Sequence, residues 1–194
     1  ESNNRIINWA QLIKTALTNL GFAYVWLAQG VGNNLLFLKL LKQRLNDTFI
    51  QNWESRLQTS SRAIFYKELS SFDYKQYLDI INIKKFRIAV TKLRLSSHRL
   101  EIETGRWARP LVERQNRKCK LCNLSVVEDE FHFVLECPAY VQLRNLLIKP
   151  YHRNRPNMLK MVQLTSSENK KEIRGLAEYA FKGFALRNEL MYLN

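Results

Sequence analysis

The sequence has little glycine and little proline, with six and four residues among 194. Because these residues punctuate chains made of many short strands and turns, their scarcity favours long helices. Cysteine is as scarce, and its three residues fall within one short block, which argues against a disulfide framework and indicates a reducing compartment. No apolar run approaches the roughly 20 residues of a membrane-spanning helix, since even the stretch 35–41 contains Lys39. We therefore expect a helical, intracellular protein with no membrane partner.

Acidic residues are also few, with 17 against 31 lysines and arginines, which gives a net charge of +14. Residues 84–120 contain 12 lysines and arginines and only 3 acids, so much of the surplus lies in one region. A positive field attracts polyanions, and nucleic acid is their commonest intracellular form. A hydrophobic content of 46% excludes a disordered basic tail. The composition predicts a folded protein that binds RNA or DNA.

The cysteine block contains a metal-ligand pattern. Cys119, Cys122, His132 and Cys137 follow the spacing C-x2-C-x9-H-x4-C. A C-x2-C pair places two thiolates on one side of an ion, and a returning segment supplies the other two ligands of a Zn²⁺ tetrahedron. The acids of 128–130 suit the first turn of a short helix that carries His132 and Cys137. Four ligands leave no open position, so we predict a structural zinc site; the alternative is three unrelated buried cysteines.

Apolar residues recur at three- and four-residue steps in several segments, which predicts amphipathic helices. The longest helix of the N-terminal half should begin at Asn33 or Asn34 and continue past Trp53. Alternation at 100–103 instead predicts a short strand. The two prolines of 149–156 predict an irregular connection rich in basic residues. The other expected helices cover 5–20, 62–69, 73–95, 139–148 with Val141, Leu143, Leu146 and Leu147 inward, 158–164, and a last helix that ends near Leu193.

The predicted fold class is therefore mainly α, a helical domain with a small zinc-knuckle-like CCHC lobe inserted between helices. We expect an N-terminal helical part over 1–105, a basic segment with the knuckle over 106–138, and C-terminal helices over 139–194. In the absence of a linker or repeat, these parts should form one compact unit.

Basic residues near the knuckle are candidates for contacts with phosphate groups. In 84–94 they recur at helical spacing, and in 105–110 two arginines flank Trp107, a pairing suited to unpaired bases. The alternatives are a solvated helix face for the basic residues and a core anchor for Trp107. The candidate nucleic-acid-binding residues are Lys84, Arg87, Arg94, Arg106, Trp107, Arg109, Arg114, Arg117, Lys118, Lys120, Arg153 and Arg155.

Three segments, 87–107, 117–122 and 128–138, resemble the tail of non-LTR (LINE-type) retrotransposon reverse transcriptases. They are similar to the zinc-binding region downstream of the polymerase thumb, and 21–26 and 42–53 fit the same tails. The resemblance implies a parent chain that copies its RNA at a nicked chromosomal target. This region would then hold template RNA or target DNA beside the reverse transcriptase domain, in the nucleus after a cytoplasmic phase.

The sequence shows no catalytic constellation of its own. It lacks the Tyr-x-Asp-Asp box of polymerases, a glycine-rich phosphate loop and an H-E-x-x-H metal motif. We therefore expect this region not to be an enzyme. One alternative is a metal-dependent nuclease built on His98, Glu101 and Glu103, whose carboxylates would share one face of a strand. Another is a host-domesticated module whose helices bind a partner protein.

Overall fold

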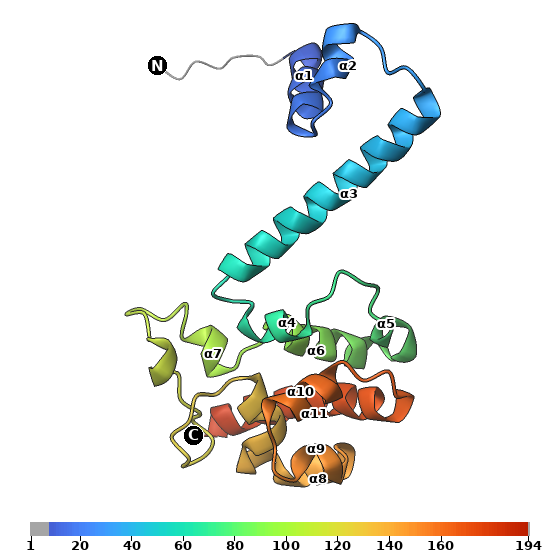
Figure 1. The fold of residues 1–194 in the computed structure, drawn as a ribbon. Coiled ribbons are helices and arrows are strands. Elements are labelled where there is room, and N and C mark those ends of the chain that lie inside the picture. The colour runs from blue at the N-terminus through green and yellow to red at the C-terminus, as the bar shows by residue number, and fades with distance from the viewer. Residues whose placement is uncertain (1–7, 194) are drawn as a thin grey trace. The chain divides into compact units, whose positions relative to one another are not determined.

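Helices provide nearly all the regular structure of the chain (Figure 1). The computed structural model describes residues 8–193, and within that range it contains no strand, only one antiparallel bridge between Lys118 and Val127. The predicted fold class, a mainly α-helical protein with a small Cys/His lobe between helices, is confirmed. Residues 5–7 of the first expected helix lie outside the described residues.

The chain divides into two compact units, Glu1–Thr59 and Ser60–Asn194. This differs from the single unit expected from the sequence. The expected boundaries near residues 105 and 138 fall inside the second unit, because side chains from 119–137 pack into the same hydrophobic core as the C-terminal helices.

The described part of the first unit, residues 8–59, contains three helices, of which the first and third have asparagine caps. Their bounds are α1 (Trp9–Asn19), α2 (Ala23–Ala28) and α3 (Asn34–Thr59). The side chain of Asn8 accepts a hydrogen bond from the amide of Gln11 (2.8 Å), and Asn33 accepts one from Leu36 (3.0 Å). Gly21, with φ of +81°, makes the turn between α1 and α2. The predicted long helix with an asparagine cap is confirmed.

The second unit is organised around its last helix, α11, which packs most extensively on α6 and also contacts α5, α8 and α10. Asn169 caps α11 by accepting a hydrogen bond from the amide of Lys171 (3.0 Å). The elements of the unit are α4 (Ile64–Leu69), α5 (Tyr77–Ile80), α6 (Lys84–Arg94), α7 (Glu101–Thr104), η1 (Arg114–Asn116), η2 (His132–Glu136), η3 (Pro138–Tyr140), α8 (Val141–Leu147), α9 (Pro150–Arg153), α10 (Met158–Thr165) and α11 (Lys170–Leu193).

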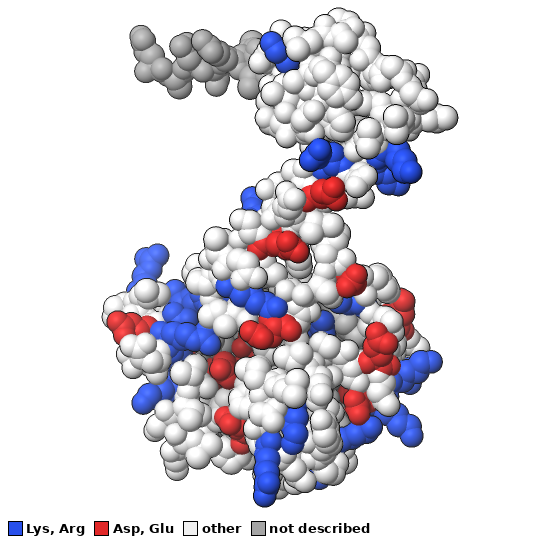
Figure 2. Space-filling model, viewed as in Figure 1, with Lys and Arg blue, Asp and Glu red and all other residues white. Residues whose placement is uncertain are grey.

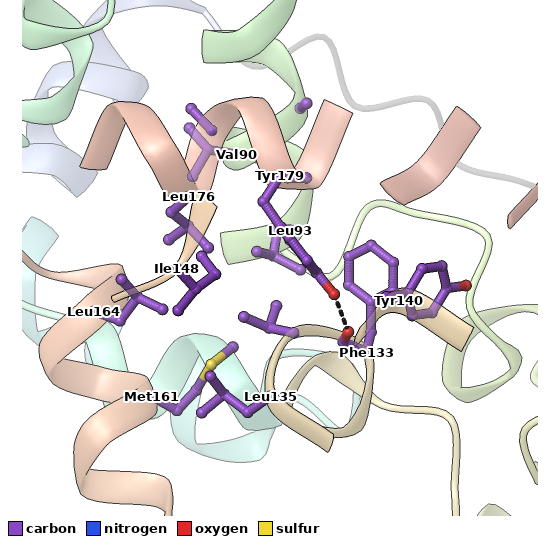
Figure 3. Close-up of a cluster of buried hydrophobic side chains, with 14 of the residues drawn as sticks. Val90, Leu93, Phe133, Leu135, Tyr140, Ile148, Met161, Leu164, Leu176 and Tyr179 are labelled. Carbon is purple, nitrogen blue, oxygen red and sulfur yellow. Dashed lines mark hydrogen bonds between the residues drawn. The ribbon is translucent and has the colours of Figure 1, made fainter. Parts of the chain in front are cut away.

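The core of the second unit joins α6, α10 and α11 to the segment that carries the predicted metal ligands (Figure 3). Phe133 lies at the junction, where its ring stacks on Phe184 with centroids 5.0 Å apart. The hydroxyl of Tyr179 donates a hydrogen bond to the carbonyl of Phe133 (2.6 Å). The fully buried apolar residues therefore fix the position of the metal lobe on the helices.

Two glycines let other segments approach α11 closely. A Cβ on Gly175 would lie 2.5 Å from the carbonyl oxygen of Leu147, at the end of α8. A Cβ on Gly183 would lie 2.7 Å from the ring of Phe133. Both glycines are therefore required by packing, although glycine by itself weakens a helix interior.

Three local predictions are wrong for identifiable reasons. The helix expected over 73–95 is interrupted, because Ile81 has extended backbone (φ −94°, ψ 91°) and its side chain enters the core. The strand expected over 100–103 is the helical turn α7, because a carboxylate oxygen of Glu128 accepts a hydrogen bond from the amide of Glu101 (2.8 Å) and so caps the turn. The loop expected over 149–156 contains α9, which Pro150 begins.

The inward face predicted for the helix at 139–148 is also partly wrong. Val141 and Leu146 are exposed, whereas Arg144 is buried. Its guanidinium donates hydrogen bonds to the carbonyls of Val134 (2.8 Å) and Cys137 (2.6 Å), so it satisfies backbone acceptors at the end of η2.

Candidate metal centre

The four predicted metal ligands come together in the structure. One ligand atom from each of Cys119, Cys122, His132 and Cys137 lies within 4.8 Å of all the others. The Sγ atoms of Cys119 and Cys137 are 3.9 Å apart, and Sγ of Cys122 is 3.4 Å from Nε2 of His132. Both residues of the C-x2-C pair thus face both residues of the H-x4-C pair.

A short antiparallel return of the backbone positions the first two ligands. The amide of Cys119 donates to the carbonyl of Val126 (2.9 Å), and the amide of Glu128 donates to the carbonyl of Arg117 (2.9 Å). These two hydrogen bonds close a loop over 119–126 that contains both cysteines. The sequence predicted that the chain folds back after Cys122, and the structure confirms it.

A π-helical turn, η2, positions the other two ligands. In an α-helix a residue five positions further on is rotated by roughly 140°, so His132 and Cys137 would face different directions. In η2 the amide of Cys137 instead donates to the carbonyl of His132 (2.8 Å), which widens the turn and brings the two side chains to one side. Asp129 begins the segment, since its side chain accepts a hydrogen bond from the amide of His132 (2.9 Å).

The separations fit a tetrahedral ion. With Zn–S near 2.3 Å and Zn–N near 2.0–2.1 Å, tetrahedral angles require S···S of about 3.8 Å and S···N of about 3.6 Å. The two separations in the cluster, 3.9 and 3.4 Å, are within a few tenths of an ångström of these values. Nδ1 of His132 is buried without a hydrogen bond, and a carboxylate oxygen of Glu136 lies 3.5 Å from it. Carboxylates in such positions orient metal-bound imidazoles.

The cluster also strongly favours ionisation of one thiol. The hydrogen bond from Cys137 lowers the pKa of Cys119 to about 3, and the same hydrogen bond raises the pKa of Cys137, which keeps the proton. Burial raises the pKa of Cys122. A metal ion that binds all four groups would displace the remaining thiol protons, so metal affinity should fall in acid.

Carboxylates next to the ligands attach the lobe to the helices. Both carboxylate oxygens of Glu128 accept hydrogen bonds from the buried guanidinium of Arg187 on α11 (2.7 Å each). Glu130 accepts hydrogen bonds from Ser96 (2.5 Å) and lies 3.0 Å from Nε2 of His98. Sequence reasoning assigned these acids only to a helix start and missed Arg187 and Arg144, since no local signal marks a basic residue that becomes buried.

The structure separates the candidate nucleic-acid-binding residues into buried, half-buried and exposed groups. Arg94 and Arg117 are buried and donate to backbone carbonyls, so the prediction that they contact phosphate groups is wrong. Arg87 and Arg106 also donate to protein acceptors, as does Arg153, and all three are half-buried. The candidates that remain exposed are Lys84, Trp107, Arg109, Arg114, Lys118, Lys120 and Arg155.

Most of the exposed candidates lie on one segment. Residues 106–120, which we call the basic loop, lead from α7 into the metal cluster and contain five of these exposed side chains. Figure 2 shows lysine and arginine side chains gathered over the part of the molecule where Figure 1 draws α7 and the segment after it. Trp107 is 74% exposed, so its alternative role as a core anchor is excluded.

The trio proposed for a nuclease does not converge. His98 pairs with Glu130, Glu101 binds Arg187 and Lys120, and Glu103 binds Arg62 and Arg106. The prediction placed both carboxylates on one face of a strand, but the segment is helical. Each member of the trio contacts a different set of partners.

Comparison of the chain with family models, curated proteins and solved structures finds no match. Among residues 8–193, no helix combines the length and apolar character needed to cross a bilayer.

Proposed function

We propose that Cys119, Cys122, His132 and Cys137 bind one Zn²⁺ ion that stabilises the fold of residues 60–194. The observation that carries this proposal is the convergence of the four ligand atoms within 4.8 Å. Three thiolates and one imidazole are the donor set of structural zinc sites, and carboxylate-rich sets suit magnesium or calcium instead. With all four positions filled by protein, the ion supplies cross-linking and no open site for chemistry.

The metal content of the purified protein tests this proposal. We expect close to one equivalent of zinc by elemental analysis, and loss of it in His132→Ala. His152→Ala is the matched control, because His152 is equally buried but lies outside the cluster. Less than half an equivalent after careful preparation, or equal zinc loss in both variants, would reject the assignment.

The zinc lobe would present the basic loop to the backbone of RNA or DNA. Supporting this role are the net charge of +14 and the exposure of Arg109, Arg114 and Lys118, which form no ion pair with any residue between 8 and 193. Phosphate contacts of this kind release counterions, so affinity falls steeply with salt and depends little on sequence. In a filter-binding assay we expect weaker binding as salt rises to physiological levels; binding that does not change with salt would contradict this proposal.

The wider role follows from the resemblance to LINE-type tails. The module would hold template RNA or target DNA beside a reverse transcriptase domain of the same chain, in the nucleus. Support for this role comes from the CCHC spacing in its basic context. A reading frame with a polymerase box upstream of Glu1 would establish the class, and a complete frame without one would contradict it.

A partner protein is the second candidate ligand, and it is favoured by the first unit. Large apolar side chains of α3 are exposed, among them Leu35 (82%), Leu38 (58%) and Phe49 (59%). Patches of this kind mark interaction surfaces. Failure of the protein to shift any nucleic acid at moderate salt would favour this candidate over the first.

A further inference from the structure

Two adjoining hollows lie along the C-terminal half of α11. Their volumes are about 550 and 390 Å³, which is the size range of ligand pockets. Arg99, Arg187 and Asn188 line both of them, so the two hollows form one depression, which we call the α11 groove. None of the four metal ligands lines this groove.

The groove is basic, and its cations are not all neutralised. The cationic lining residues are Arg62, Lys92, Arg99, Lys120 and Arg187, against one acid, Glu101. Arg187 is paired with Glu128 and Arg62 with Glu103, so these two contribute little net charge. Lys92 and Arg99 are exposed and form no ion pair within residues 8–193, and Lys120 is 59% exposed although its Nζ lies 3.1 Å from Glu101. The available positive charge is therefore that of Lys92, Arg99 and, in part, Lys120.

Aromatic side chains line both parts of the groove. Tyr192 lines the smaller hollow and is 88% exposed. Phe184 lines the larger hollow, where stacking on Phe133 with an interplanar angle of 4° holds its ring in place. Cations beside aromatic rings are the combination that binds unpaired nucleotides, because phosphates meet the cations and bases stack on the rings. A duplex offers the same phosphates, but its base faces are hidden in the stack.

We propose that the α11 groove binds a single-stranded nucleic acid, with Lys92 and Arg99 on its phosphates and a base stacked on Tyr192. This inference rests on the proposed function and deepens it, since it locates a contact surface distinct from the basic loop. The sequence suggested Lys92 only as one of the basic residues that recur over 84–94, and it did not suggest Arg99 or Tyr192. The three residues come from α6, from the segment before α7 and from α11, and only the fold brings them together.

Fluorescence anisotropy with a labelled oligo(dT) 12-mer, an oligo(U) 12-mer and a matched DNA duplex tests this assignment in the full chain. We expect Lys92→Ala/Arg99→Ala to weaken single-strand binding and to reduce the slope of log K against log salt by about 1.4, from roughly 0.7 per lost phosphate contact. Tyr192→Ala should weaken it by about 5-fold or more and leave the salt slope unchanged. Photo-crosslinking of a 5-bromouracil oligonucleotide should label a peptide that contains Tyr192.

The matched control is Lys170→Ala/Lys171→Ala, which removes two exposed charges at the opposite end of α11, roughly 30 Å away. Unchanged zinc content and helicity in every variant would show that the fold is intact, as expected for exposed side chains.

Equal losses of single-strand affinity in the groove variant and the control would overturn the groove and leave only general electrostatic binding. Loss on Arg109→Ala/Arg114→Ala but not in the groove variant would do the same, and place the contact in the basic loop. Equal weakening of duplex and single strand in the groove variant would overturn the single-strand assignment. If the unmodified protein binds no oligonucleotide even at low salt, the proposed function itself fails.

Discussion

The two units of the chain differ in how much of their apolar content is buried in a core. In residues 60–193, leucines and aromatics of α6, α10 and α11 are buried in one core with Phe133, and charged side chains are scattered over the surface. In residues 8–33 the only charged side chain is Lys14, yet Trp9, Leu12 and Leu27 are exposed. Apolar content is therefore no guide to where the stability of this protein lies. We infer that the second unit folds cooperatively around its core and metal cluster, whereas the first has little core of its own among the described residues.

The largest expected effect is that of metal removal. Structural zinc sites contribute on the order of 10 kcal/mol, so Cys137→Ser or chelation should abolish cooperative unfolding of the second unit while much of the helicity of α1–α3 remains. Circular dichroism during heating, with and without chelator, measures both quantities. Added zinc should restore the transition in the chelated protein but not in the variant. If chelation leaves the thermal transition unchanged, the metal does not stabilise the second unit.

The next effect concerns the buried ion pair between Glu128 and Arg187. Glu128→Ala should lower the free energy of unfolding by about 3 kcal/mol, because it removes two of the three carboxylate hydrogen bonds to the buried guanidinium of Arg187 and leaves α7 without its cap. Glu54→Ala removes an exposed carboxylate from α3 in the first unit and should change stability by less than about 0.5 kcal/mol. Urea denaturation measures both values, and similar losses would contradict the proposed difference between the units.

Leucine truncation compares the two units directly. Leu176→Ala, in the core, should cost about 2–5 kcal/mol. Leu36→Ala, at a position 55% exposed on α3, should be nearly neutral because alanine is also a good helix former. A large loss on Leu36→Ala would show that α3 is buried against something in solution.

Glycine substitution should have opposite signs in the two units. Gly175→Ala should destabilise by about 1–3 kcal/mol, because its Cβ would meet a backbone oxygen and the helix must shift. Gly30→Ala should be neutral or slightly stabilising, since the nearest atom to its Cβ would be 3.8 Å away and alanine restricts the unfolded chain. The melting temperature of each variant, compared with that of the unmodified protein, shows whether the substitution stabilises or destabilises.

The smallest expected effect depends on pH. Hydrogen bonds from Lys149 and Ser167 lower the pKa of Glu172, so its folded-state pKa lies below its unfolded one. The stability that this carboxylate contributes is present above the unfolded pKa and disappears as pH falls through the folded pKa. Glu172→Gln should therefore cost at most about 1 kcal/mol at pH 7, and less as acid is added. If the difference in free energy of unfolding between Glu172→Gln and the unmodified protein grew as the pH fell, this account of Glu172 would be contradicted.

The sequence was informative wherever a structural feature depends on nearby residues. Asn33 marks the start of α3, and the C-x2-C pair marks the loop that closes on Val126, because caps and chelating loops are local. It failed where a distant group decides the outcome. The cap on α7 comes from Glu128, 27 residues away, and Arg94 is buried where a carbonyl at the end of α10 accepts a hydrogen bond from its guanidinium. Counting charges could not separate arginines that bind backbone from those that face solvent.

The wide turn at residues 132–137 also bears on how this lobe can vary in length. In an ordinary α-helical turn, a cysteine four positions after the histidine would lie on the same side of the helix as the histidine. Here the cysteine is five positions after it, and the wider π-helical turn η2 accommodates the extra residue while both ligands still face the metal site. Related lobes with three residues between histidine and cysteine could therefore keep the same metal geometry on an ordinary α-helical turn.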